Sequence, residues 1–196
     1  MRAALIALAA SAFSTTFAFA DPRALDLVQS VCVSHSADTV AATAELATRG
    51  WRQITDEERR QRDPSDVAAG FIMNWSRSQA WAPEDDPSLA IVLGEGPVGN
   101  GEARAEYCAI VERIAFSRQV RAVRRWLGFN RFQTWGPGGD IFAYLRDAEG
   151  ALGNGADVAP TQLSVAMEQG RYGFVQVVGD NATSVVNFSV LHPAQR

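Results

Sequence analysis

The segment Ala105-Glu106-Tyr107-Cys108-Ala109-Ile110-Val111-Glu112 holds Cys108, one of only two cysteines among the 196 residues of the chain. The other cysteine, Cys32, lies near the start of the chain, so a disulfide would fasten the N-terminal third to this segment. The loop from Cys32 to Cys108 holds 77 residues, and chain entropy gives such a disulfide about 4–5 kcal/mol of stabilisation. Two buried free thiols, or a metal site that uses both cysteines, are the alternatives.

A metal site would need further ligands in a suitable spacing. The chain has two histidines, His35 and His192, and it contains neither a C-x-x-C nor an H-x-x-x-H pattern. Structural zinc sites use four Cys or His ligands, usually in such patterns. We therefore expect a disulfide between Cys32 and Cys108 and no metal site.

The residues around Cys108 alternate in polarity, which is typical of a strand. Charged residues take every second position, at Glu102, Arg104 and Glu106. Leu89–Leu93 is a short apolar run that suits a buried strand, so the two runs are predicted to form a hairpin. The first half of the Cys108 segment has no β-branched residue, however, and a helix over residues 102–112 stays open as the alternative.

The connection between these two runs matches the dinucleotide-binding pattern G-x-G-x-x-G, at Gly94-Glu95-Gly96-Pro97-Val98-Gly99. Nucleotide binding needs a helix that begins inside this motif. The pair Asn100-Gly101 follows at once, and it favours a tight hairpin turn instead. We therefore interpret the motif as a glycine-rich loop, and we expect no cofactor.

The first twenty residues are typical of a secretory signal peptide. Arg2 precedes an apolar run, and Ala18-Phe19-Ala20 matches the A-x-A cleavage pattern. A membrane anchor is the alternative, but a spanning helix needs about 20 predominantly apolar residues, and serines and threonines interrupt this run. The sequence predicts a signal peptide over residues 1–20, a single domain over residues 21–196, and a periplasmic or secreted location without membrane insertion.

The basic residues are of one kind only. The chain has no lysine, so all 18 basic residues are arginines, and the net charge of −4 becomes −5 once Arg2 leaves with the signal peptide. Together with the many alanines and glycines, this composition is typical of a GC-rich bacterial genome. A mildly acidic domain gives no electrostatic reason to expect nucleic acid or an anionic membrane surface as a partner.

The first third of the mature chain is predicted to be mainly helical. Apolar periodicity and capping residues predict helices that begin at Asp21, Ser36, Thr55 and, later in the chain, Ser117. The helix from Ser36 should end at Gly50, with its inner face formed by Val40, Ala44 and Ala47. The helix from Ser117 should end at Gly128, with its inner face formed by Val120, Val123 and Leu127.

Beyond residue 138 the sequence favours strands. Residues 141–145 are apolar on both faces, which predicts a central strand. Further strands are predicted around residues 163–167, 172–178 and 186–190, joined by short turns. This order of elements predicts an α+β fold in which N-terminal helices pack on a C-terminal, mainly antiparallel sheet.

The best candidate for a binding surface is the polar side of the helix over residues 117–128. Guanidinium groups there would bind carboxylate or phosphate, and an indole would add a stacking surface. The candidate ligand-binding residues are Arg118, Arg121, Arg124, Arg125 and Trp126. An amphipathic helix with merely solvated arginines has the same pattern, so that interpretation is the alternative.

Two functions are compatible with these observations. The first is an exported, non-catalytic binding protein whose partner is a small molecule or a component of the cell envelope. The second is a cell-envelope hydrolase that uses His35 or His192 as a base. A hydrolase should place one of these histidines in a cleft beside a serine, a cysteine or a carboxylate. Neither histidine lies in a recognisable catalytic motif, so no catalytic residue is predicted.

Overall fold

The structure is a computed structural model that describes residues 22–63, 65–67, 76–99, 101–134 and 139–194. The predicted signal peptide lies outside these residues. Within them, no helix is both long enough and apolar enough to cross a membrane.

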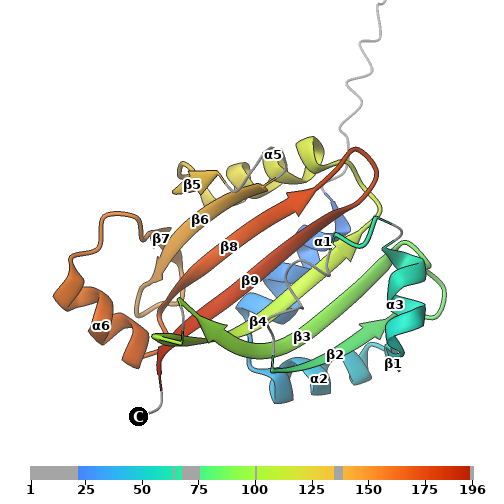
Figure 1. The fold of residues 1–196 in the computed structure, drawn as a ribbon, viewed down its shortest axis with the longest axis horizontal. Helices are drawn as coiled ribbons and strands as arrows, with labels where there is room; N and C mark the ends of the chain where they lie inside the picture. Colours follow the sequence, from blue (N-terminus) through green and yellow to red (C-terminus); the bar gives the residue numbers. More distant parts are fainter. Residues whose placement is uncertain (1–21, 64, 68–75, 100, 135–138, 195–196) are drawn as a thin grey trace, which may run out of the picture.

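One sheet runs through the described part of the chain (Figure 1). Its nine strands follow the order β1-β2-β3-β4-β9-β8-β6-β5, with β7 also paired to β6, and every pair is antiparallel. The strands are β1 (Arg52–Ile54), β2 (Arg77–Ala82), β3 (Leu89–Val98), β4 (Ala103–Glu112), β5 (Gln133–Thr134), β6 (Gly139–Arg146), β7 (Leu152–Asn154), β8 (Tyr172–Gly179) and β9 (Ser184–Pro193).

Helices pack on this sheet, which confirms the predicted α+β fold of N-terminal helices on a mainly antiparallel sheet. The helices are α1 (Arg23–Leu27), the π-helix η1 (Val28–Val33), α2 (Thr39–Thr48), α3 (Asp56–Arg62), α5 (Phe116–Leu127) and α6 (Pro160–Glu168). In Figure 1, α1 lies behind the sheet, α5 lies along its upper edge, and α6 lies at the lower left, near the end of the sheet where β8 begins.

The two faces of the sheet carry separate apolar clusters. The larger cluster combines α1, η1 and α5 with the strand residues that share a face with Cys108, such as Leu93 and Phe188. We call this the helix face. On the opposite face, one cluster surrounds Val92 and Val111, and another packs beneath Ala166 of α6. Because strand side chains alternate between faces, β3, β4 and β9 are apolar on both sides.

The hairpin predicted around Cys108 is confirmed as β3 and β4, with Leu93 directly opposite Cys108. The open question over residues 102–112 is thereby answered in favour of a strand. β4 pairs with β3 on one side and β9 on the other, and this central position outweighs the weak β propensity of its first half. The prediction of a loop at Gly94–Gly99 is wrong, because β3 continues through this motif to Val98.

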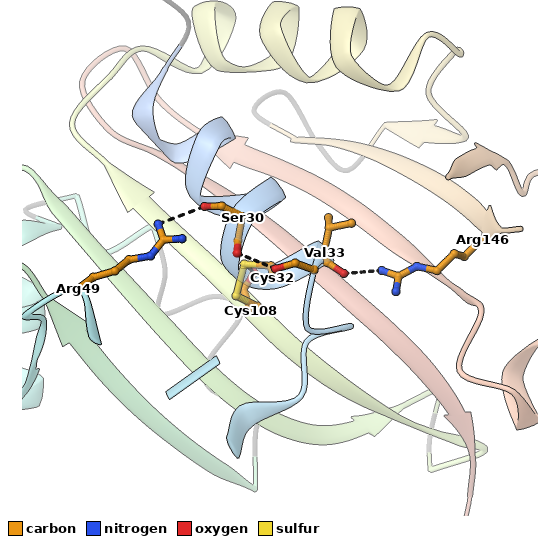
Figure 2. Close-up of a disulfide and its surroundings, with 7 residues drawn as sticks. Ser30, Cys32, Val33, Arg49, Cys108 and Arg146 are labelled. Atoms are coloured by element: carbon orange, nitrogen blue, oxygen red, sulfur yellow. Dashed lines mark hydrogen bonds between the residues drawn. A yellow bond between two sulfur atoms is a disulfide. The ribbon is translucent and has the colours of Figure 1, made fainter. Parts of the chain in front are cut away.

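The predicted disulfide between Cys32 and Cys108 is present and joins η1 to β4 (Figure 2). Beside it, the Arg146 guanidinium donates a hydrogen bond of 2.8 Å to the carbonyl oxygen of Val33, the last residue of η1, and a second one to Ser36 Oγ. A cation at the carboxyl end of a helix offsets the partial negative charge of the unpaired carbonyls. The π-helix η1 is thus fixed to the sheet at two points.

The prediction of a strand around residues 163–167 is wrong, because this segment lies within the helix α6. Pro160 occupies the first turn of α6, where its missing N–H is not needed. The alternation of apolar residues also fails as a guide here, because Val165 is 47% exposed whereas its neighbour Ala166 is 2% exposed. Helical period, not strand period, decides which side chains of this segment reach the core.

Two of the predicted helices differ in detail. The helix after η1 begins at Thr39, because Ser36 and Ala37 have positive φ and Asp38 caps the first turn. Its buried side chains are Ala42 and Leu46, and all three predicted inner residues, Val40, Ala44 and Ala47, are exposed.

In α5, the N-cap is Ala115 and not the predicted Ser117, whereas Gly128 ends the helix in the left-handed conformation as predicted. The capping box predicted at Thr55 is confirmed at the start of α3.

Candidate functional site

The arginine surface predicted from the sequence lies on the outer side of α5. Val120, Val123 and Leu127 are buried beneath it, so Arg118, Arg121, Arg124 and Arg125 point away from the core as the periodicity predicts. Arg121, Arg124 and Arg125 are exposed, and Arg118 is half-buried.

A buried carboxylate neutralises part of this surface. Asp140 of β6 is 3% exposed, and it accepts a hydrogen bond from Arg124 and another, of 3.0 Å, from Arg131. Arg118 and Arg125 also interact with neighbouring groups. The charge of this surface is therefore partly compensated within the protein, as expected of a solvated helix face.

Trp126, the fifth predicted residue, lies apart from the arginines. Its side chain lines a cavity of about 440 Å³ between the end of α5, η1 and the turn that leads into β7. Among the described side chains that line this cavity, only Gln29 and the indole N–H of Trp126 are polar. Binding sites usually combine an apolar wall with several convergent polar groups, so this cavity is a weaker candidate.

A cleft that the sequence did not predict lies between α2 and the sheet. It has a volume of about 390 Å³, and it is lined by residues 38–40 at the start of α2, residues 77–79 of β2, residues 93–95 of β3, and Glu106 of β4. We call it the α2–β2 cleft. Its volume falls within the range of about 300–1,000 Å³ that is usual for ligand pockets.

Five ionisable side chains from four neighbouring strands form a charged network at this cleft. The strand register places Arg77 opposite Glu95, Glu95 opposite Glu106, and Arg104 opposite His192. All five therefore share the helix face, because the register aligns them with Cys108 at even spacings. Arg104 donates to Glu95 at 2.5 Å and to Glu106 at 3.3 Å.

Two features of this network reduce the stability of the folded protein. Two glutamates directly opposite each other repel, and Glu95 and Glu106 are such a pair. Arg104 offsets the repulsion, yet its Nε is buried without an acceptor, which costs stability. The glutamates are 29% and 25% exposed, so solvent still screens their ion pairs. Local rules of stability are most often broken at functional sites.

The two histidines have different surroundings. His192 Nε2 lies 3.6 Å from Glu106 Oε2, and this nitrogen is buried and forms no hydrogen bond. The ring packs against Gly170, where an added Cβ would lie 3.4 Å from His192 Cε1. His35 lies in the turn between η1 and α2. Among the described residues, no three His, Cys, Asp or Glu side chains are grouped so as to hold a metal ion.

The sequence signal for this network was weak. Arg104 and Glu106 stood out only as the polar positions of an alternating strand. Their link to Arg77, Glu95 and His192 depends on the register of three strand pairs, and one of these, β4 with β9, joins segments that are distant in sequence. No family model, curated protein or solved structure matches this chain, so its functional assignment rests on the geometry described above.

Proposed function

We propose that the protein is an exported, non-catalytic binding protein and that its ligand occupies the α2–β2 cleft. The observation that carries the proposal is the like-charged pair of Glu95 and Glu106, held together by Arg104 at a cleft of ligand size. Export is supported by the A-x-A pattern at Ala18–Ala20 and by the disulfide, which is rare in reducing compartments.

The cleft offers both polar and apolar contacts to a ligand. Its floor presents carboxylate and guanidinium groups on paired strands, which hold side chains more firmly than loops do. Arg77 at its edge is 86% exposed along the side chain, and Val40 adds an exposed apolar group on the opposite wall. A ligand with polar groups and a small apolar part fits this chemistry best.

A thermal-shift screen with matched variants tests the proposal. The panel contains amino acids, short peptides, sugars and organic acids. We expect at least one compound to raise the melting temperature, because a ligand that binds only the folded state stabilises it. Glu106→Gln and Arg77→Ala should remove this shift, and the double variant Arg121→Ala with Arg125→Ala should retain it. The reverse pattern would assign binding to the arginine surface, and no shift from any compound would contradict the proposal.

A second candidate function is hydrolysis, because His192 lies beside a carboxylate that lines the cleft. A histidine base oriented by a carboxylate is a common catalytic arrangement. This candidate is weaker, because Nε2 of His192 is buried beside Glu106 and His192 is not among the described residues that line the cleft. Activity against ester, peptide or glycoside substrates that disappears in His192→Gln would favour it over the binding function.

A further inference from the structure

Part of the outer edge of β2 has no partner strand. β1 pairs with β2 only at Ala80, Trp81 and Ala82. The preceding residues, Arg77–Gln79, are exposed and have no strand on this side among the described residues. The N–H and C=O groups of an open strand edge are available to pair with another polypeptide.

This open edge forms one side of the α2–β2 cleft, and the first turn of α2 forms the other. The unpaired edge consists of residues 77–79, so it spans about 10 Å in the extended conformation. Val40, on the α2 side, is an apolar residue that is 81% exposed. A groove between an edge strand and a helix is a geometry in which extended peptides add a strand to a sheet.

Arg77 is the one cation among the described residues that line the cleft, whereas Asp38, Glu95 and Glu106 are acids, so an acidic ligand group is favoured only beside Arg77. The contact between Arg77 and Glu95 is 3.9 Å long, whereas Glu95 has a closer partner in Arg104 at 2.5 Å. The guanidinium of Arg77 is therefore available to a second carboxylate. Asp38, the acid on the opposite wall, already accepts hydrogen bonds from the first turn of α2, from Val40 N at 2.8 Å and from Ala41 N at 3.0 Å.

We infer that the ligand of the α2–β2 cleft is an extended polypeptide segment that pairs with Arg77–Gln79 of β2. It places an acidic side chain opposite Arg77 and an apolar side chain against Val40. Because strand side chains alternate between faces, these two side chains stand an even number of residues apart in the peptide. The inference rests on the proposed function, since both concern the same cleft, and it specifies the class of ligand.

The probe is a random heptapeptide library displayed on phage and selected on the oxidised, folded protein. Selected peptides should share an acidic residue and an apolar residue at positions i and i+2. Arg77→Glu should weaken binding of the synthetic consensus peptide about tenfold or more, and a peptide with arginine in place of the acid should recover it. Val40→Ser should weaken binding by a smaller factor. The matched control Arg121→Glu, a charge reversal on α5, should bind as the unaltered protein does.

Two measurements separate strand pairing from attachment through side chains alone. Methylation of single peptide nitrogens should weaken binding about tenfold at alternate positions only, since each loss removes one hydrogen bond. Hydrogen exchange of the backbone amides in residues 77–79 should slow when the peptide binds. Failure to select any peptide, or equal affinity of all methylated peptides, overturns the inference. Concentration-dependent dimers that protect the same amides would also overturn it, by assigning the edge to a second copy of the chain.

The outcomes for the two proposals are distinguishable. If small molecules shift the melting temperature through Glu106 and Arg77 but no peptide binds, the proposed function stands and the polypeptide inference fails. If neither class of ligand requires the cleft residues, both fail.

Discussion

Removal of the disulfide between Cys32 and Cys108 should cost a large part of the stability of this protein. The two residues are 76 apart in sequence, and for a loop of this size the chain-entropy relation gives about 4.5 kcal/mol. For a domain of this length, such a loss lowers the melting temperature by about 9–18 °C. The double variant Cys32→Ala with Cys108→Ala makes the change without leaving a single reactive thiol.

Urea denaturation followed by circular dichroism measures this loss. The matched control is the unaltered protein, unfolded and refolded in reductant, which keeps both sulfur atoms. Both should lose a similar free energy of unfolding. Their dependence on urea should become steeper, because an unfolded chain without the crosslink exposes more surface. A loss below about 1 kcal/mol in both would refute the reasoning, since η1 would then be held by packing and by the contacts of Arg146.

Four further predictions concern single side chains. Arg104→Met should cost about 1–2 kcal/mol at pH 7, because it leaves Glu95 and Glu106 face to face without the guanidinium that pairs with both; urea denaturation measures this loss. Thr55→Ala should cost about 1 kcal/mol in thermal unfolding, as expected for the loss of an N-cap. Hydrogen bonds from Arg52 and from the α3 cap lower the pKa of Glu58 from 4.5 to about 2; its stabilising contribution is therefore present above about pH 4.5 and lost as the pH falls toward 2, which the pH dependence of unfolding in Glu58→Gln checks. Gly173→Ala should cost more than about 3 kcal/mol or prevent folding, because the added Cβ would lie 1.8 Å from a carbonyl oxygen of β9; Gly153→Ala, whose nearest contact is 3.7 Å, is the control.

The sequence predicted those parts of the fold in which local patterns and tertiary packing agree. The strand after Gly139 and the helix that ends at Gly128 each combine clear periodicity with turn or cap residues at one end. The disulfide was predictable because the chain has only two cysteines. In these regions one pattern and one chemistry favoured a single structure. For residues 102–112 the sequence left strand and helix open, and the pairing of β4 with β3 and β9 decides for the strand.

The errors arose where a short pattern has two interpretations. Residues 163–167 alternate like a strand, but they form a helix that starts at Pro160. The glycines of residues 94–99 resemble a loop, yet β4 pairs with β3 through Val98 and keeps this segment extended. Val40 was placed inside because it is apolar, although the helix presents Ala42 and Leu46 to the core. A short apolar pattern does not determine whether a segment is a helix or a strand, or which of its sides is buried.

The candidate site was beyond prediction for a different reason. Its charged residues are distributed from Arg77 to His192, and each one by itself looks like an ordinary polar position of a strand. They become a network only through the register of β2, β3, β4 and β9. A shift of one residue in any of these pairs would send the side chains of one strand to the opposite face. The arginines of α5, in contrast, could be identified from the sequence, because the period of a helix relates only residues that are close together in the chain.

The most direct test of the binding site is nuclear magnetic resonance mapping with a library of small fragments on the ¹⁵N-labelled protein. Fragments bind weakly but gather at true ligand sites, so they locate the site even while the natural ligand is unidentified. We expect the shifted amides to cluster around the α2–β2 cleft, in residues 38–40, 77–79 and 93–95 and at Glu106. Shifts that cluster on α5 instead, or that fail to cluster anywhere, would contradict this expectation.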